Sequence, residues 1–164
     1  MRGMWIRGFA VVGVVAAIGA CDGRARPPTS PGAEAAAQGG PTVQVAQVEG
    51  DEFAVVALRE ASARAGAATR IAVVATPKEG WKINLEYPAK LKVVSAETFA
   101  VERNEYPLAD AVLKDIHELR FEIPVTPGAA GPHPIELLLK FGLCDASRCV
   151  TRQATLGWTW EVGG

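Results

Sequence analysis

Neither sign of charge is in excess in this chain of 164 residues, which carries 17 basic and 18 acidic side chains. A protein that binds nucleic acid needs a basic surface, so we do not expect nucleic acid as a partner. The apolar run at residues 9–17 is shorter than the roughly 20 residues that a membrane-spanning helix requires. No internal repeat and no nucleophile elbow of a serine hydrolase is visible.

Histidine is scarce, and the two histidines, His117 and His133, lack ligand spacing to any cysteine. We therefore expect no metal site and no cofactor. We interpret His117 as a solvated loop residue. His133, which stands between two prolines, is interpreted as a turn residue.

Cysteine is scarce too, with three in the chain, and the first of them belongs to an N-terminal signal. Residues 1–20 have a basic start, a short apolar stretch and small residues before Cys21, which is typical of a secretory signal. The sequence Ile18-Gly-Ala-Cys21 resembles the lipobox of bacterial lipoproteins. That resemblance implies cleavage before Cys21 and a lipid on its sulfur. An ordinary cleavable signal beside a chance cysteine is the alternative.

The lipid would hold the protein on the periplasmic side of the bacterial cell envelope, attached to a membrane through Cys21. Asp22 follows directly, but its effect on sorting differs between bacteria, so inner and outer membrane both stay open. Residues 21–41 are rich in Gly, Pro, Ala, Ser and Thr and have few large apolar groups, which predicts a disordered, flexible linker. Residues 42–164 amount to one domain.

Short alternating segments dominate this domain. At 119–125 the apolar residues occupy every second position and polar residues lie between them, as in a strand with one buried face. Turn residues separate such segments. The pattern predicts an all-β, antiparallel two-sheet sandwich. The strands are expected at 42–48, 53–58, 70–76, 91–94, 119–125, 135–141 and 155–162.

Two segments contain good helix formers. For 57–68 we expect a hairpin connection, because Gly66 and the prompt return into the strand at 70 leave little room for a helix. For 109–116 we expect a loop with one helical turn.

Cys144 and Cys149, separated by four residues, lie between two predicted strands. Two thiols so placed can face each other across a short hairpin, which is compatible with a disulfide. A bridge that closes so small a loop stabilises the fold by only about 2 kcal/mol. The spacing leaves two interpretations open: a redox-active pair, and a permanent staple of the kind that is common in exported domains.

Three sequence elements resemble a known family: Gly80-Trp-Lys-Ile-Asn84, Phe121-Glu-Ile-Pro-Val125, and the segment 136–149, which ends in the cysteine pair. Their order and spacing are similar to those of the N-terminal domain of the thiol:disulfide interchange protein DsbD and of stand-alone disulfide bond corrector proteins. The resemblance covers about residues 50–162. It implies an immunoglobulin-like periplasmic domain whose paired cysteines, here Cys144 and Cys149, relay electrons.

The resemblance further implies thioredoxin-like or DsbD-type redox proteins as partners, and an aromatic cap loop that shields the pair. Tyr106 lies in the segment where that cap belongs. The chain departs from the family after the second cysteine, where members often have an aromatic residue or Leu followed by Pro-Pro and this chain has Val150-Thr-Arg152. This departure changes the surface on which a partner would dock.

Charges near the pair suggest which sulfur is the better nucleophile. Arg148 and Arg152 would favour a thiolate at Cys149, whereas Asp145 would disfavour one at Cys144. The sequence thus predicts a membrane-anchored thiol-disulfide relay with Cys149 as the more nucleophilic sulfur. The competing prediction is an immunoglobulin-like lipoprotein that serves as a binding or assembly module with a structural disulfide.

Overall fold

The computed structural model of this protein describes residues 41–164. The predicted signal peptide at 1–20, the lipidation site Cys21 and all of the predicted 21–41 linker except Pro41 lie outside the described residues. Pro41 itself is exposed and belongs to no strand.

The described residues form eleven strands and one short 3₁₀ helix. They are β1 (Thr42–Glu49), β2 (Phe53–Glu60), β3 (Thr69–Pro77), β4 (Lys82–Ile83), β5 (Lys90–Ser95), β6 (Phe99–Val101), β7 (Glu105–Pro107), η1 (Leu108–Asp110), β8 (Leu113–Lys114), β9 (Leu119–Pro127), β10 (Gly131–Cys144) and β11 (Cys149–Val162).

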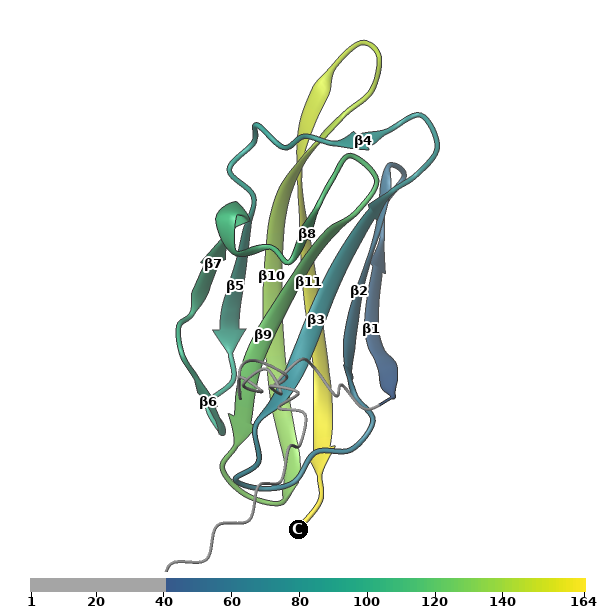
Figure 1. Ribbon diagram of the computed structural model, residues 1–164. Helices are drawn as coiled ribbons and strands as arrows, with labels where there is room; N and C mark the ends of the chain where they lie inside the picture. The colour runs from purple at the N-terminus through teal and green to yellow at the C-terminus, as the bar shows by residue number, and fades with distance from the viewer. Residues whose placement is uncertain (1–40) are drawn as a thin grey trace, which may run out of the picture. The chain divides into compact units, whose positions relative to one another are not determined.

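The strands form two antiparallel sheets that pack face to face (Figure 1). Sheet 1 has the order β1-β2-β3-β9-β6, with β8 paired to β9. Sheet 2 has the order β11-β10-β5-β7, with β4 paired to β10. The predicted all-β sandwich of immunoglobulin-like architecture is confirmed.

The core lies between the two sheets and follows from alternation along each strand. In β9 the side chains of Leu119, Phe121, Ile123 and Val125 are all buried, and the residues between them are half-buried or exposed. β11 repeats the pattern: Leu156, Trp160 and Val162 are buried, and the residues between these inward positions, such as Gly157 and Glu161, are exposed. Burial of apolar side chains on one face of each sheet is the main force that holds the sheets together.

The seven predicted strands are all present. The hairpin expected at 57–68 is confirmed, because β2 ends at Glu60 and β3 begins at Thr69. The helical turn expected at 109–116 is η1, which begins slightly earlier and is followed by the two-residue strand β8. The strands β4, β6, β7 and β8 were not predicted, because two or three residues are too few to show a period of two.

The interpretation of His133 as a turn residue is wrong. His133 lies within β10, is 4% exposed, and its Nε2 is 2.8 Å from the carbonyl oxygen of Ala129. Its proline neighbours are tolerated because the pairing of β10 with β5 extends only from Glu136 to Lys140. Residues 131–135 of β10 have no β5 residue beside them. On that side there is no β5 carbonyl to accept an N–H, so Pro132 and Pro134 lose no hydrogen bond there.

In the part of the chain from 41 to 164, no helix has the length and apolar character needed to cross a membrane.

Candidate functional site

The two cysteines lie at the end of the longest hairpin in residues 41–164. β10 and β11 are each 14 residues long, and they pair without interruption from Gly131 opposite Val162 to Cys144 opposite Cys149. Cys144 and Cys149 form a disulfide, with Cα atoms 4.0 Å apart. Figure 1 shows the turn of this hairpin extending beyond the neighbouring loops.

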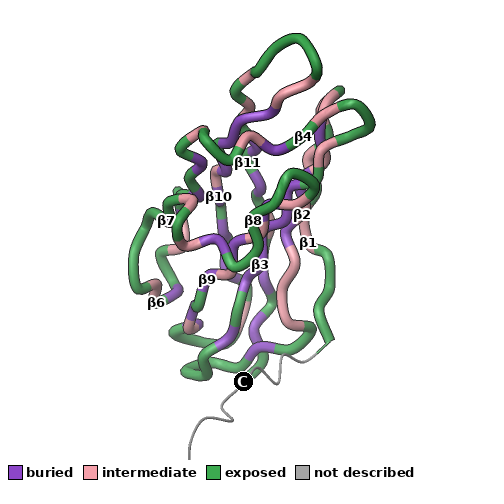
Figure 2. Tube along the Cα trace, turned by 45° about the horizontal axis from the view of Figure 1, so that its top comes forward, coloured by how far each residue is buried: buried purple, intermediate pink, exposed green. Residues whose placement is uncertain are grey.

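The disulfide lies on the outer face of sheet 2. Phe141 and Leu143 point into the core and are fully buried, so Cys144, one residue further along, points the other way. Cys149 is directly opposite Cys144 and therefore shares its face. Cys144 is half-buried and Cys149 is exposed, and Figure 2 shows that the turn between them is exposed as well.

The turn that joins the cysteines is held by the side chain of Asp145. Its Oδ1 accepts hydrogen bonds from the backbone N–H of Ser147 at 2.7 Å, the Ser147 hydroxyl at 2.8 Å and the backbone N–H of Arg148 at 2.8 Å. These bonds hold the pKa of Asp145 below its ordinary value, and the two from backbone N–H groups have the largest effect. The turn therefore keeps its shape through its own hydrogen bonds.

A third strand, β4, lies on the other side of Cys144. Lys82 is opposite Cys144 and Ile83 is opposite Leu143. Ile83 is buried like Leu143, whereas Lys82 is exposed and shares the outer face with the disulfide. Lys82, Cys144 and Cys149 thus form one row across three neighbouring strands.

Two aromatic side chains border this row. The guanidinium carbon of Arg148 lies 5.7 Å from the ring centroid of Trp81, which is within the range of a cation–π interaction. Tyr87 packs on Gly142, the next outward position of β10 after Cys144. A Cβ at Gly142 would lie 2.6 Å from the Cβ of Tyr87, so only glycine permits this contact.

Arg152 points to the inner face of sheet 2 and pairs there with Glu52. It lies directly opposite the inward residue Phe141, and its Nε donates a 3.1 Å hydrogen bond to Glu52 Oε2. A second bond joins Arg152 Nη2 to Glu52 Oε1. The predicted help of Arg152 to a thiolate at Cys149 is therefore wrong, because Glu52 neutralises Arg152 on the other side of the sheet.

This ion pair predicts an acid-sensitive contact between the two sheets. The hydrogen bond from Arg152 is the largest cause that lowers the pKa of Glu52. A carboxylate with a lowered folded-state pKa stabilises the fold above its unfolded pKa of about 4.3, and this contribution is lost as pH falls through the folded-state pKa. Arg152→Met is therefore expected to reduce the loss of stability between pH 7 and pH 3, measured as the change in urea unfolding midpoint.

The matched control is Arg70→Met, which removes an exposed arginine with a looser 3.8 Å contact to Glu122. An equal reduction in both variants would show that overall charge, and not the Arg152–Glu52 pair, sets the acid sensitivity.

Tyr106, the residue predicted for a cap, is not beside the cysteines. It lies in β7 opposite Leu91, which is itself opposite Leu139, five residues along β10 from Cys144. Its ring is 3% exposed and packs in the core, with the guanidinium carbon of Arg103 4.8 Å from its centroid. Burial raises the pKa of its hydroxyl. The aromatic residues near this end of the hairpin are instead Trp81, which contacts Arg148, and Tyr87, which packs on Gly142.

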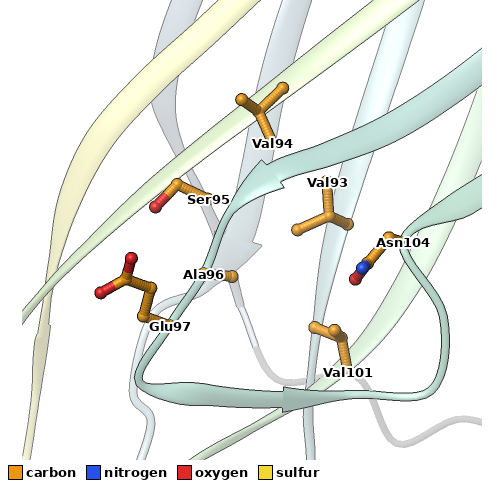
Figure 3. Close-up of a pocket in the computed structure, with 7 residues that line it drawn as sticks. All are labelled: Val93, Val94, Ser95, Ala96, Glu97, Val101 and Asn104. Atoms are coloured by element: carbon orange, nitrogen blue, oxygen red, sulfur yellow. The ribbon is translucent and has the colours of Figure 1, made fainter.

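The described surface has hollows, and the positions of two of them relative to the disulfide bear on the site. One, of about 400 Å³, is lined by residues 76–82 together with His117, so it lies next to Lys82 and Trp81. The other, of about 210 Å³, is lined by Val93, Val101, Asn104 and their neighbours near the end of β5 (Figure 3). Ser95 in that hollow pairs with Glu136, eight residues along β10 from Cys144, so it is remote from the disulfide.

No group of three or more potential metal ligands is found within residues 41–164. His117 is in the turn between β8 and β9, where its backbone N–H donates to Asp115 Oδ1 at 2.6 Å. His133 is in the core, eleven residues along β10 from Cys144. The structure therefore joins neither histidine to the cysteines.

The sequence located the cysteines and Arg148 but missed Lys82, Trp81 and Tyr87 near them, and it missed Glu52 as the partner of Arg152. Trp81 and Lys82 belong to the element Gly80-Trp-Lys-Ile-Asn84, which was noted for its resemblance alone. A two-residue strand leaves no periodic signal that would have placed Lys82 opposite Cys144.

Comparisons with known proteins give a likeness of fold. No family model matches the chain, and no curated protein matches it. Among solved structures, it is similar to the GAE domain of GGA2p from Saccharomyces cerevisiae, with a TM-score of 0.44 and 9% sequence identity. The match covers 71% of this chain and 97% of that domain. A likeness at this level carries no functional argument.

Proposed function

We propose that this chain is a lipid-anchored thiol-disulfide relay of the bacterial cell envelope, with Cys144 and Cys149 as its redox pair. Its partners are thioredoxin-like or DsbD-type redox proteins, and its anchor is the lipid on Cys21. The observation that carries the proposal is the position of the disulfide: it lies on the outer face of sheet 2 at the end of a hairpin, with Cys149 exposed.

A structural role accounts poorly for a disulfide in this position. The bridge closes a loop of a few residues, which is worth about 2 kcal/mol. The hairpin is already held by 14 consecutive residue pairs and by the hydrogen bonds of Asp145. A bridge that served stability would gain more by closing a long loop or by joining the two sheets.

The two cysteines differ in exposure, which supports different parts for them in the proposed exchange. A partner thiolate needs access to the sulfur that it attacks, and Cys149 offers that access. Cys144 is half-buried and is the leaving sulfur in that step. In the reverse direction the Cys144 thiolate resolves the mixed disulfide that Cys149 forms with a partner.

The proposal is tested by the redox state of the pair in cells. Rapid acid quenching followed by alkylation is expected to trap a mixture of reduced and oxidised Cys144–Cys149, because a relay passes through both states. A deletion of the envelope thiol-reducing system should convert the reduced fraction to disulfide. A pair that is fully oxidised in every background would favour the alternative, an immunoglobulin-like binding or assembly lipoprotein with a structural bridge.

A further inference from the structure

We propose that Lys82 is a positioning residue for the redox pair: its ammonium group stabilises the thiolate of Cys144 as the disulfide opens. The inference rests on the proposed function and adds a residue on a strand far from the cysteines in sequence. It starts from the pairing of β4 with β10, in which Lys82 is the residue directly opposite Cys144.

Side chains of directly opposed residues in an antiparallel pair lie on one face, with Cβ atoms about 5 Å apart. Lys82 is exposed on this face, and no carboxylate among residues 41–164 forms an ion pair with it. Its positive charge is therefore available to the neighbouring sulfur.

The two charged residues next to Cys144 along the chain, Asp145 and Arg148, are engaged with each other. Asp145, the next residue, accepts three hydrogen bonds within its own turn, and its Oδ2 lies 3.7 Å from Arg148 Nε. Arg148 also stacks on Trp81. Glu79 and His117 line the hollow that Lys82 borders, and Tyr87 packs on Gly142. Lys82 is therefore the cation that lies directly opposite Cys144 and has no ion pair among residues 41–164.

The chemical step is a thiol-disulfide exchange with a partner protein that carries a dithiol. The partner thiolate attacks Cys149 Sγ, a new S–S bond joins the two proteins, and the Cys144–Cys149 bond breaks. The electron pair of the broken bond goes to Cys144 Sγ, which leaves as a thiolate beside Lys82 and later takes a proton from water. The partner's second thiolate then releases Cys149, so the partner is oxidised and the pair reduced. A leaving thiol of lower pKa departs faster, which is where Lys82 acts.

The test uses the full-length chain with Cys149→Ala, in which the thiol of Cys144 is free. Its reactivity towards iodoacetamide is followed as a function of pH on the peptide that contains Cys144, so that Cys21 does not contribute. Lys82→Met, which keeps the apolar stem, is expected to raise the pKa of Cys144 by about 0.5 to 1 unit, a threefold to tenfold change in thiolate dissociation. Lys82→Arg should restore the original profile.

Lys140→Met is the matched control. Lys140 is exposed on the same face of β10, four residues or about 13 Å from Cys144. Its removal should leave the profile unchanged, and about 1 M salt should reduce the effect of Lys82→Met, because the Debye length falls to about 3 Å. With the disulfide intact, Lys82→Met should also slow reduction by a small dithiol.

An unchanged profile in Lys82→Met, or an equal shift in Lys140→Met, would overturn the assignment. These readouts need no cellular partner, so they separate the two claims. A clear shift together with a pair that is always oxidised in cells would support the electrostatic role of Lys82 and reject the relay.

Discussion

Under the proposed relay, Cys144→Ala is expected to accumulate a mixed disulfide with a thioredoxin-like or DsbD-type protein of the cell envelope. The exposed Cys149 thiolate attacks a partner disulfide, and the partner's own thiolate leaves. Without Cys144 no internal thiol can resolve the product. The covalent complex should appear as a band of higher mass on non-reducing gels, disappear with reductant, and yield the partner to mass spectrometry.

The matched control is Cys149→Ala, in which the half-buried Cys144 remains. We expect several-fold less captured partner, because Cys144 is half-buried and lies beside the neighbouring strand β4. The variant that lacks both cysteines should capture nothing.

Equal capture by the two single variants would contradict the assignment of Cys149 as the sulfur that exchanges with partners. Absence of any specific complex in both, in cells where the redox proteins of the envelope are present, would contradict the relay and favour the structural disulfide.

The elements that the sequence predicted are those whose information is local. Strands such as 119–125 reveal themselves because every second side chain enters the core, and the position of each apolar residue then fixes its face. The same holds for the cysteine pair. The two cysteines are five positions apart with strand-forming residues on both sides, and this local pattern is enough to assign them to one hairpin.

The surroundings of the pair depend on contacts between distant segments, and these the sequence could not provide. Glu52 and Arg152 are 100 positions apart. Arg152 is adjacent to the cysteines along the chain, yet its phase in β11 sends it to the other face of the sheet, where Glu52 binds it. The sequence therefore assigned the charge of Arg152 to the wrong face of the sheet. It overlooked Lys82, whose charge lies on the face that carries the disulfide.

A second large effect is expected in the core: Trp160→Ala should lower the free energy of unfolding by about 3–5 kcal/mol. Trp160 is fully buried, its ring centroid lies 5.6 Å from that of Phe99, and the guanidinium carbon of Arg59 lies 5.1 Å from its centroid. Alanine would leave a cavity between the sheets and remove both contacts. Urea unfolding followed by circular dichroism measures the loss, and the melting temperature should fall by about 10 °C or more.

Trp158→Ala is the matched control, since Trp158 is the same residue type two positions earlier in β11 but is only half-buried. Trp158→Ala should lower the free energy of unfolding clearly less, because less apolar surface returns to water.

The two variants also test how far the reactivity of the disulfide depends on the rest of the sandwich. Because Trp160 pairs with His133, eleven residues along β10 from Cys144, its loss should leave the reactivity of the disulfide unchanged under conditions where the variant is folded. A Trp158→Ala cost equal to that of Trp160→Ala would mean that burial between the sheets is not what makes Trp160 important.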